Sequence, residues 1–176
     1  MASGITVDDN SPSGFQLSLA NEQSAHAVDV PRMLDAARRV LAGSKFTTAT
    51  ISLAVVDDAA IHSLNQKFLQ HDYPTDVLSF VLDANGQHLN GEVVLSADTA
   101  AAASEGEWSA ADEQLLYVIH GMLHLIGMDD QSETDARKMR AAERYYLQEC
   151  GVAAAEAARM ARSTDEMAGG GGTADW

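Results

Sequence analysis

The sequence predicts a single α/β (α+β) domain, in which about five helices pack on a small mixed sheet of four strands. Short β-rich segments intermix along the chain with amphipathic segments of helical period. The 176 residues are 46% hydrophobic, which suffices for one sizeable core. Polar or glycine-rich stretches mark both ends, so we expect flexible tails at 1–12 and 151–176 around a folded domain at 13–150.

The first half of the domain should alternate strands and helices. In chain order we expect a strand at 15–20, a helix at 30–43, a strand at 48–58 and a helix at 59–69. The two strand segments show the alternation and β-branched residues typical of strands. Pro31 near the start and Gly43 at the end delimit the first helix. Ile61, Leu64 and Phe68 fall on one face of the second helix.

The second half should begin with two short strands and continue as helices. We expect strands at 76–82 and 91–96 around a loop at 83–90 (DANGQHLN), then helices at about 97–105, 109–126 and 132–149. The first of these helices is rich in alanine, and the second carries two histidines. No internal repeat and no second domain boundary is visible in the sequence.

Composition limits the functions that the chain can have. The net charge is −15, from 11 basic and 26 acidic residues, and it is spread along the chain. Such a balance opposes tight non-specific binding to nucleic acid, so an RNA substrate would need a local basic track or a metal ion. The single cysteine, Cys150, excludes an internal disulfide and fits a cytoplasmic protein. Neither a signal peptide nor a membrane span is expected.

The stretch HGMLHLIGMDD at 120–130 predicts a metal site. His120 and His124 are four residues apart, so on a helix both imidazoles lie on one face. Gly127 allows the helix to end, after which Asp129 or Asp130 can return towards the histidines. Two imidazoles and a carboxylate suit one zinc ion, with a fourth position left for water. The spacing has the frame of the metzincin signature, which favours Asp130 as the ligand.

Three details of that stretch affect the chemistry. Gly121 stands where a zincin has its general-base glutamate, so the base remains unknown. Asp130 brings a negative charge that a third histidine would not, so water at the metal should be less acidic than in an all-histidine site. Asp129 is a ligand in place of Asp130, an acceptor that orients a histidine, or a turn residue.

Two further groups of residues are candidates for contacts with a substrate. Thr75 and Ser79, in YPTDVLSF, would donate hydrogen bonds to a phosphate, although the segment also reads as an ordinary turn and strand entry. Arg137, Arg140 and Arg144 form a basic stripe on the last predicted helix. The stripe is either a solvated face or a contact to a phosphate backbone.

Three segments together resemble the YbeY family of metal-dependent endoribonucleases, which mature ribosomal RNA. They are LNQKFLQHDYPTDVLSF at 64–80, GEVVLS at 91–96 and HGMLHLIGMDD at 120–130, and the helix after them is also similar. The resemblance covers about residues 50–150. It implies an α/β fold with a mixed sheet, one zinc ion per chain and cleavage of single-stranded RNA in ribosomal RNA processing and ribosome quality control. It implies RNA and ribosomal subunits or their proteins as partners, and no DNA.

Two positions depart from the family pattern. Carried over, the zinc ligands are His120, His124 and Asp130, but the family usually has a third histidine where Asp130 stands. Leu69 stands where the family typically has an arginine. Both departures motivate an alternative, a ribosome-associated binding factor whose metal site is structural or degenerate. A metalloprotease is a further alternative from the zincin frame, and Gly121 argues against it.

Overall fold

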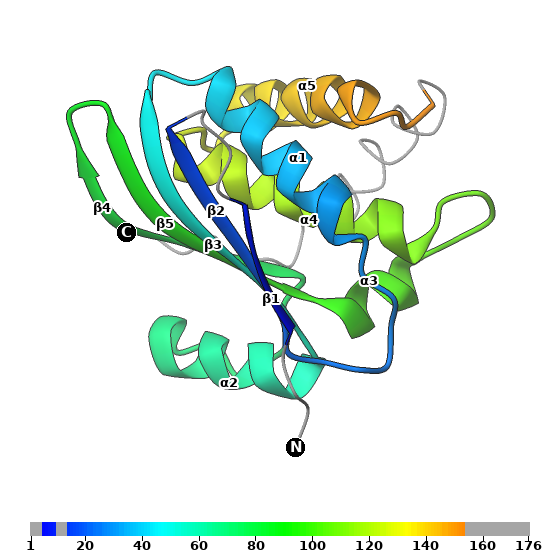
Figure 1. The fold of residues 1–176 in the computed structure, drawn as a ribbon. Helices are drawn as coiled ribbons and strands as arrows, with labels where there is room; N and C mark the ends of the chain where they lie inside the picture. Colours follow the sequence, from blue (N-terminus) through cyan, green and yellow to red (C-terminus); the bar gives the residue numbers. More distant parts are fainter. Residues whose placement is uncertain (1–4, 10–13, 154–176) are drawn as a thin grey trace.

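The structure is a computed structural model that describes residues 5–9 and 14–153. One mixed sheet forms its centre, with α1, α4 and α5 on one face and α2 on the other (Figure 1). In chain order the elements are β1 (Ile5–Asp9), β2 (Phe15–Asn21), α1 (Val30–Ala42), β3 (Thr48–Val56), α2 (Asp58–Leu69), β4 (Val77–Asn85), β5 (His88–Ser96), α3 (Ala97–Ala103), α4 (Ala110–Leu125) and α5 (Glu133–Glu149). The predicted fold class is confirmed.

The strands follow the order β1-β2-β3-β5-β4. The three inner strands β2, β3 and β5 run parallel, and each edge strand pairs antiparallel with its neighbour. Along β2 and the first half of β3, buried residues alternate with exposed or half-buried ones. Helices cover both faces of the end of β5, so Val93 and Val94 are both buried although they point to opposite faces. The edge strand β4 follows α2 and pairs with β5, and thus lies beside the helix that carries the histidines.

The sheet has five strands, and the prediction of four was low by one. β1 lies within the segment expected to be an N-terminal tail. Its sequence, ITVDD, is short and acidic, and its backbone is held by pairing with β2 rather than by a pattern of its own. The loop expected at 83–90 was also wrong, because β4 and β5 extend through it to a two-residue turn. Gly86 permits that turn with a φ of +60°.

The remaining predictions for the ends of the chain concern residues that the structure scarcely covers. The C-terminal tail predicted at 151–176 lies outside the described residues except for 151–153. Within the described ranges, no helix has both the length and the apolar character needed to cross a bilayer.

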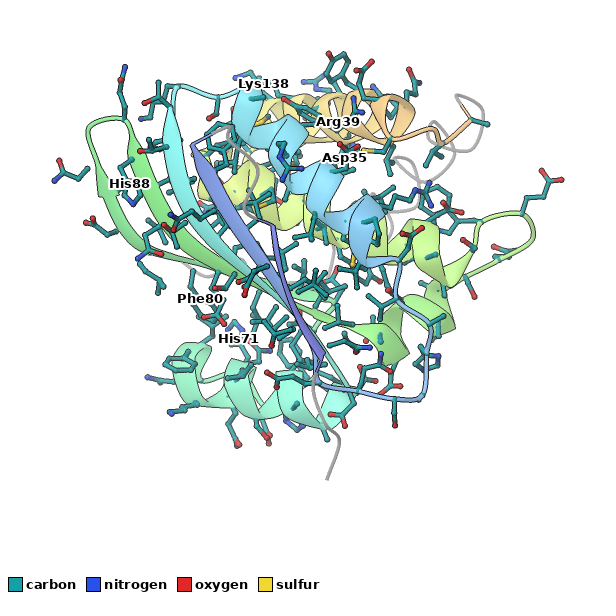
Figure 2. The ribbon with its side chains drawn as sticks, in the orientation of Figure 1. Asp35, Arg39, His71, Phe80, His88 and Lys138 are labelled. Atoms are coloured by element: carbon teal, nitrogen blue, oxygen red, sulfur yellow. The ribbon has the colours of Figure 1, made fainter. Side chains whose placement is uncertain are left out.

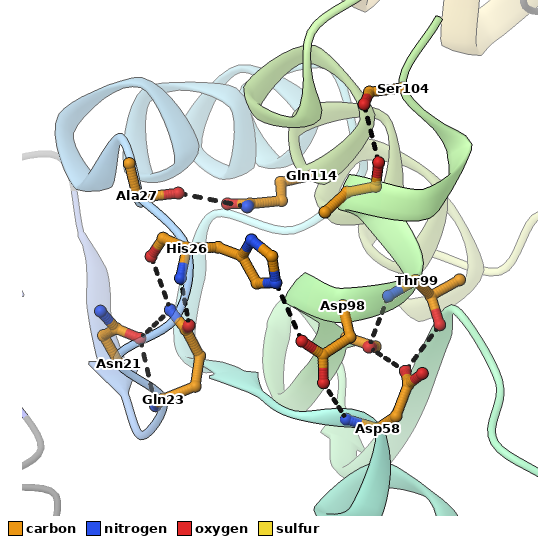
Figure 3. Close-up of polar contacts among 11 residues, drawn as sticks. Asn21, Gln23, His26, Ala27, Asp58, Asp98, Thr99, Ser104 and Gln114 are labelled. Carbon is orange, nitrogen blue, oxygen red and sulfur yellow. Dashed lines mark hydrogen bonds and ion pairs between the residues drawn. The ribbon is translucent and has the colours of Figure 1, made fainter.

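A polar network fixes the start of α2 against α3 (Figure 3). Asp98 accepts a hydrogen bond from the backbone N–H of Asp58 at 3.0 Å, and its other oxygen lies 2.9 Å from His26 Nε2. The hydroxyl of Thr99 donates to the Asp58 carboxylate at 2.7 Å. The hydrogen bond from Asp58 and the contact with His26 lower the pKa of Asp98. The network ties together the loop before α1, α2 and α3.

Gly121 sets how closely α4 approaches the sheet. A Cβ atom at this position would lie 2.6 Å from Val93 Cγ1 and 3.3 Å from Val77 Cγ2. The helix therefore touches β5 and β4 with its own backbone, and no larger side chain fits at 121 without a shift. A capping box of Ser109 and Asp112 fixes the other end of α4.

We predict that Gly121→Ala destabilises the protein even though alanine favours a helix by about 1 kcal/mol. Overpacking against a stiff valine costs about 1–3 kcal/mol, so the net change in the free energy of unfolding should be a loss. Urea unfolding followed by circular dichroism measures it.

The matched control is the double variant Gly121→Ala/Val93→Ala. Truncation of Val93 removes the atoms that a Cβ at 121 would meet. The double variant should therefore lose less unfolding free energy than the sum of the two single losses, by about 1 kcal/mol. Strictly additive losses would contradict a steric contact between the two positions.

Candidate metal centre

Three donor atoms converge at the C-terminal end of α4. His120 Nε2 lies 3.0 Å from His124 Nε2, and Asp130 Oδ2 lies 3.9 and 3.8 Å from these nitrogens. Tetrahedral zinc with bonds of about 2.0–2.1 Å spaces its ligand atoms about 3.3–3.4 Å apart. In the described part of the chain, these residues form the one group of three or more His, Cys, Asp or Glu with all donor atoms within 4.8 Å. The triangle has the size of one face of a zinc tetrahedron.

The end of α4 explains how Asp130 reaches the histidines. The helix ends at Leu125, and Gly127 takes a φ of +99°, which turns the chain back. Asp129 Oδ1 then accepts hydrogen bonds from the backbone N–H groups of Asp130, at 2.7 Å, and Gln131, at 3.2 Å. Asp129 is thus exposed and shapes the turn, whereas Asp130 points into the cluster. Of the two acids that the sequence offered, the structure brings Asp130 to the histidines.

The outer ring nitrogens of both histidines have acceptors. His120 Nδ1 lies 2.7 Å from Glu143 Oε1 on α5, and His124 Nδ1 lies 3.0 Å from the carbonyl oxygen of Met128. If each Nδ1 carries the proton and donates it, each Nε2 presents a lone pair to the other. Two lone pairs at 3.0 Å repel unless a proton or a cation lies between them. A hydrogen bond from Nδ1–H to a carboxylate or a carbonyl oxygen is the arrangement that metal-ligating histidines adopt.

Asp130 supplies a further test of whether a cation fits. Its Oδ1 atom is buried and has no hydrogen-bond partner, and its Oδ2 atom faces the two nitrogens. A buried carboxylate oxygen without a partner is costly, and a metal ion would relieve that cost. The donor set of two imidazoles and a carboxylate also suits zinc. The residues present therefore fit the ion that the sequence predicted.

The electrostatic surroundings of the two histidines differ. Burial alone would lower the pKa of His120, but Glu143, Asp76 and Asp130 outweigh it and raise that pKa. Burial and the neighbouring His120 lower the pKa of His124. The carboxylates around His120 therefore favour a positive charge at the cluster. Carboxylates around a centre of this kind favour a bound positive charge.

Two buried acids, on α5 and α4, were missed in the sequence. Glu143 is 3% exposed, and it lies on the buried face of α5 between Met139 and Leu147. Its four-residue spacing from both apolar neighbours was a signal, because an acid on an apolar stripe needs a buried partner. Glu113 is also buried on α4, where burial raises its pKa and the indole N–H of Trp108 donates to it.

The residues predicted to contact a substrate lie on β4, on the turn before it and on α5. The Thr75 hydroxyl donates to Asp76 Oδ1 at 3.1 Å, and Ser79 shares the strand face of Val77, which packs near Gly121. Arg137 is exposed, with Glu133 at 3.6 Å, while Arg140 and Arg144 are half-buried on α5. An RNA contact by any of these side chains stays a prediction. In addition, Leu69 packs against the apolar cluster between α2 and the sheet.

Comparison with known proteins identifies the family. The family profile described as "Endoribonuclease YbeY" matches residues 18–151. The chain belongs to this family. The match includes the histidines, the returning aspartate and Glu143, and it confirms the resemblance read from the sequence. The metalloprotease alternative also loses its basis, because position 121 faces the sheet and has no room for a glutamate.

Curated relatives agree with this assignment. An endoribonuclease YbeY of Rhodopirellula baltica is 42% identical over 106 residues, which are 58% of this chain and 55% of that protein. One from Syntrophotalea carbinolica is 38% identical over 72% of this chain and 90% of its own length. One from Geobacter metallireducens is 36% identical over 74% and 92%.

A solved structure supports the fold. The solution structure of TM1509 from Thermotoga maritima matches with a TM-score of 0.51 and 23% identity, over 77% of this chain and 88% of that one. At this identity the likeness concerns the fold alone.

We predict that Glu143→Gln weakens zinc binding about 10- to 100-fold, the usual cost of losing such a carboxylate behind a ligating histidine. The amide keeps the volume but lacks the charge that holds His120 Nδ1–H. Competition with a chromophoric chelator measures the affinity. Glu133→Gln, at an exposed position of the same helix, is the matched control and should bind zinc as the unmodified protein does. Equal affinity in both variants would exclude the proposed role of Glu143.

Proposed function

We propose that this member of the YbeY family is a zinc-dependent endoribonuclease that cleaves single-stranded RNA. One observation carries the proposal: the donor atoms of His120, His124 and Asp130 converge, and Asp130 has a buried oxygen without a partner. We further propose that it acts in the cytoplasm on ribosomal RNA, in its maturation and in ribosome quality control. Ribosomal subunits or their proteins are then its partners.

Each group at the metal centre would have a separate role in RNA cleavage. When bound, zinc supplies a Lewis acid for a phosphate oxygen and increases the acidity of water at the site. Glu143 and the Met128 carbonyl hold the two imidazoles in the ligating tautomer. Thr75, at the turn before β4, would orient the phosphate. Position 121 offers no general base, so the nucleophile, water or the 2′-hydroxyl of RNA, receives little help from a side chain there.

The test is cleavage of a single-stranded ribosomal RNA fragment by protein of measured zinc content, with and without a chelator. We expect cleavage that the chelator abolishes, and His120→Ala should reduce cleavage to the chelator-treated level. His88→Ala, at the β4–β5 hairpin and outside the cluster, is the matched control and should cleave normally. Equal cleavage by the chelated and zinc-loaded protein would refute the proposal.

A ribosome-associated binding factor is the second candidate function. It is favoured by Asp130 at the position of the usual third histidine and by the net charge of −15. Bound zinc without cleavage, together with normal co-sedimentation of His120→Ala with ribosomal subunits, would support this candidate over the enzyme. An unmodified protein that does not associate with ribosomes would exclude it.

We predict that Asp130→His shifts the pH–rate profile to lower pH. The carboxylate reduces the effective positive charge at the centre, so water there should lose its proton at a higher pH than in an all-histidine site. Replacing it with a neutral ligand reverses that effect. Asp83→Asn removes one negative charge from an exposed position of β4 and should leave the profile in place. An unmoved profile in Asp130→His would contradict the assigned role of the carboxylate.

A further inference from the structure

Aromatic rings gather where α2 ends and β4 begins. This α2–β4 aromatic surface consists of Phe68, His71, Tyr73 and Phe80. Phe68 and Phe80 meet edge to face with centroids 5.6 Å apart, and His71 and Tyr73 stack at 5.3 Å with 12° between their planes. Phe68 is 52% exposed and Tyr73 is 42% exposed. Figure 2 shows His71 and Phe80 between the sheet and α2.

The loop that carries two of these rings is held in place by hydrogen bonds. The buried side chain of Asn65 donates from Nδ2 to the carbonyl oxygen of Tyr73 at 2.8 Å. Asp72 Oδ1 accepts from Gln66 at 3.3 Å and lies 2.9 Å from His62 Nε2. The loop is therefore held in place before any ligand arrives, which lowers the entropy cost of binding. Of the four rings, Phe68 and Tyr73 are exposed, and His71 and Phe80 are half-buried.

The first residues of β4 connect the aromatic surface to the helix that carries the metal centre. Val77, four residues after Tyr73, packs near Gly121 of α4, next to His120. Four extended residues span at most about 14 Å. β4 is an edge strand of the sheet, with Phe80 towards α2 and Val77 towards α4. The rings and the metal centre thus lie on opposite faces of the sheet, and an RNA strand bound at both would cross the edge strand β4.

We propose that the α2–β4 aromatic surface binds unpaired bases of the RNA substrate by stacking. The proposal rests on the proposed function. Rings bind bases without sequence preference, and only unpaired bases expose a face to them. The segment has Lys67, with its ammonium 5.0 Å from the centre of the Phe68 ring, against the acids Asp72 and Asp76. Affinity must therefore come from stacking more than from phosphates.

The polar setting of the rings favours RNA over a protein partner. The charged residues Lys67 and Asp72 lie among the rings, which form two contacting pairs, Phe68 with Phe80 and His71 with Tyr73. Protein interfaces that bind stably have a well-packed apolar centre. Base stacking needs only individual exposed rings with a cation nearby.

The test uses Phe68→Ala and Tyr73→Ala, whose exposed side chains can be removed with little effect on folding. For each, the affinity for a single-stranded 2′-O-methyl oligonucleotide that cannot be cleaved is measured by fluorescence anisotropy. We expect about a five- to hundredfold loss per ring, a matching rise in KM for a cleavable strand, and little change in kcat. Tyr73→Phe, which keeps the ring, should restore binding.

Tyr145→Ala is the matched control, because Tyr145 is 57% exposed on α5 and outside the surface. It should bind the oligonucleotide normally. Since one lysine serves the surface, raising the salt concentration should weaken binding with a log–log slope of about −1 or shallower. A steep slope would overturn the proposal in favour of phosphate contacts.

The outcomes separate this inference from the proposed function. If the unmodified protein cleaves RNA and neither ring variant changes KM or affinity, the surface is not a base-binding site although the enzyme stands. If the protein cleaves no RNA but still binds the oligonucleotide in a way that depends on the rings, the proposed function is refuted and the base-binding surface is supported. Loss of ribosomal protein binding in the ring variants, with RNA binding intact, would overturn the inference in favour of a protein partner.

Discussion

The close approach of α4 to the sheet at Gly121 is the constraint on which the rest of the site depends. With backbone in contact with Val93 and Val77, the helix runs beside the start of β4. Asp76, just before that strand, therefore lies close enough to raise the pKa of His120. The other side of the same helical turn is then free to carry two imidazoles. The glycine that looks like a missing catalytic base is a packing requirement, and the site has to work without a base from that position.

The helix alone does not make a metal centre, because each ligand depends on a different neighbour. Glu143 reaches His120 from α5, the Met128 carbonyl reaches His124 from the turn, and Asp129 bends that turn so that Asp130 closes the triangle. These neighbours follow α4 closely in the chain: the helix ends, the chain turns back at Gly127, and α5 packs across the end of α4. Each of these contacts fixes the position of an imidazole ring or a carboxylate. Together they leave three donor atoms facing one point.

The parts of this arrangement that the sequence could predict are those set by short spacing. His120 and His124 share a helical face whatever surrounds them. Gly127 predicts the turn that returns an acidic residue towards the histidines. Glu143 could not be paired with His120 from sequence, since 23 residues separate them and the packing of α5 decides the contact. β1 was missed for a similar reason, because a short acidic strand exists only through its partner β2. The zincin-like spacing favoured Asp130 over Asp129 as the ligand, but the role of Asp129 in shaping the turn became visible only in the structure.

Leu69 and Asp130 pose a common question about how an acidic chain binds RNA. Asp130 brings a negative charge to the metal centre, and Leu69 packs into the apolar cluster under α2 without contributing a charge. Long-range attraction of phosphates is weak in a chain of charge −15. A substrate must then be held by interactions that act at contact, and exposed rings beside the centre supply such interactions. Substrates bound in this way are selected by unpaired bases rather than by charge, which would make strand specificity a consequence of the chain's acidity.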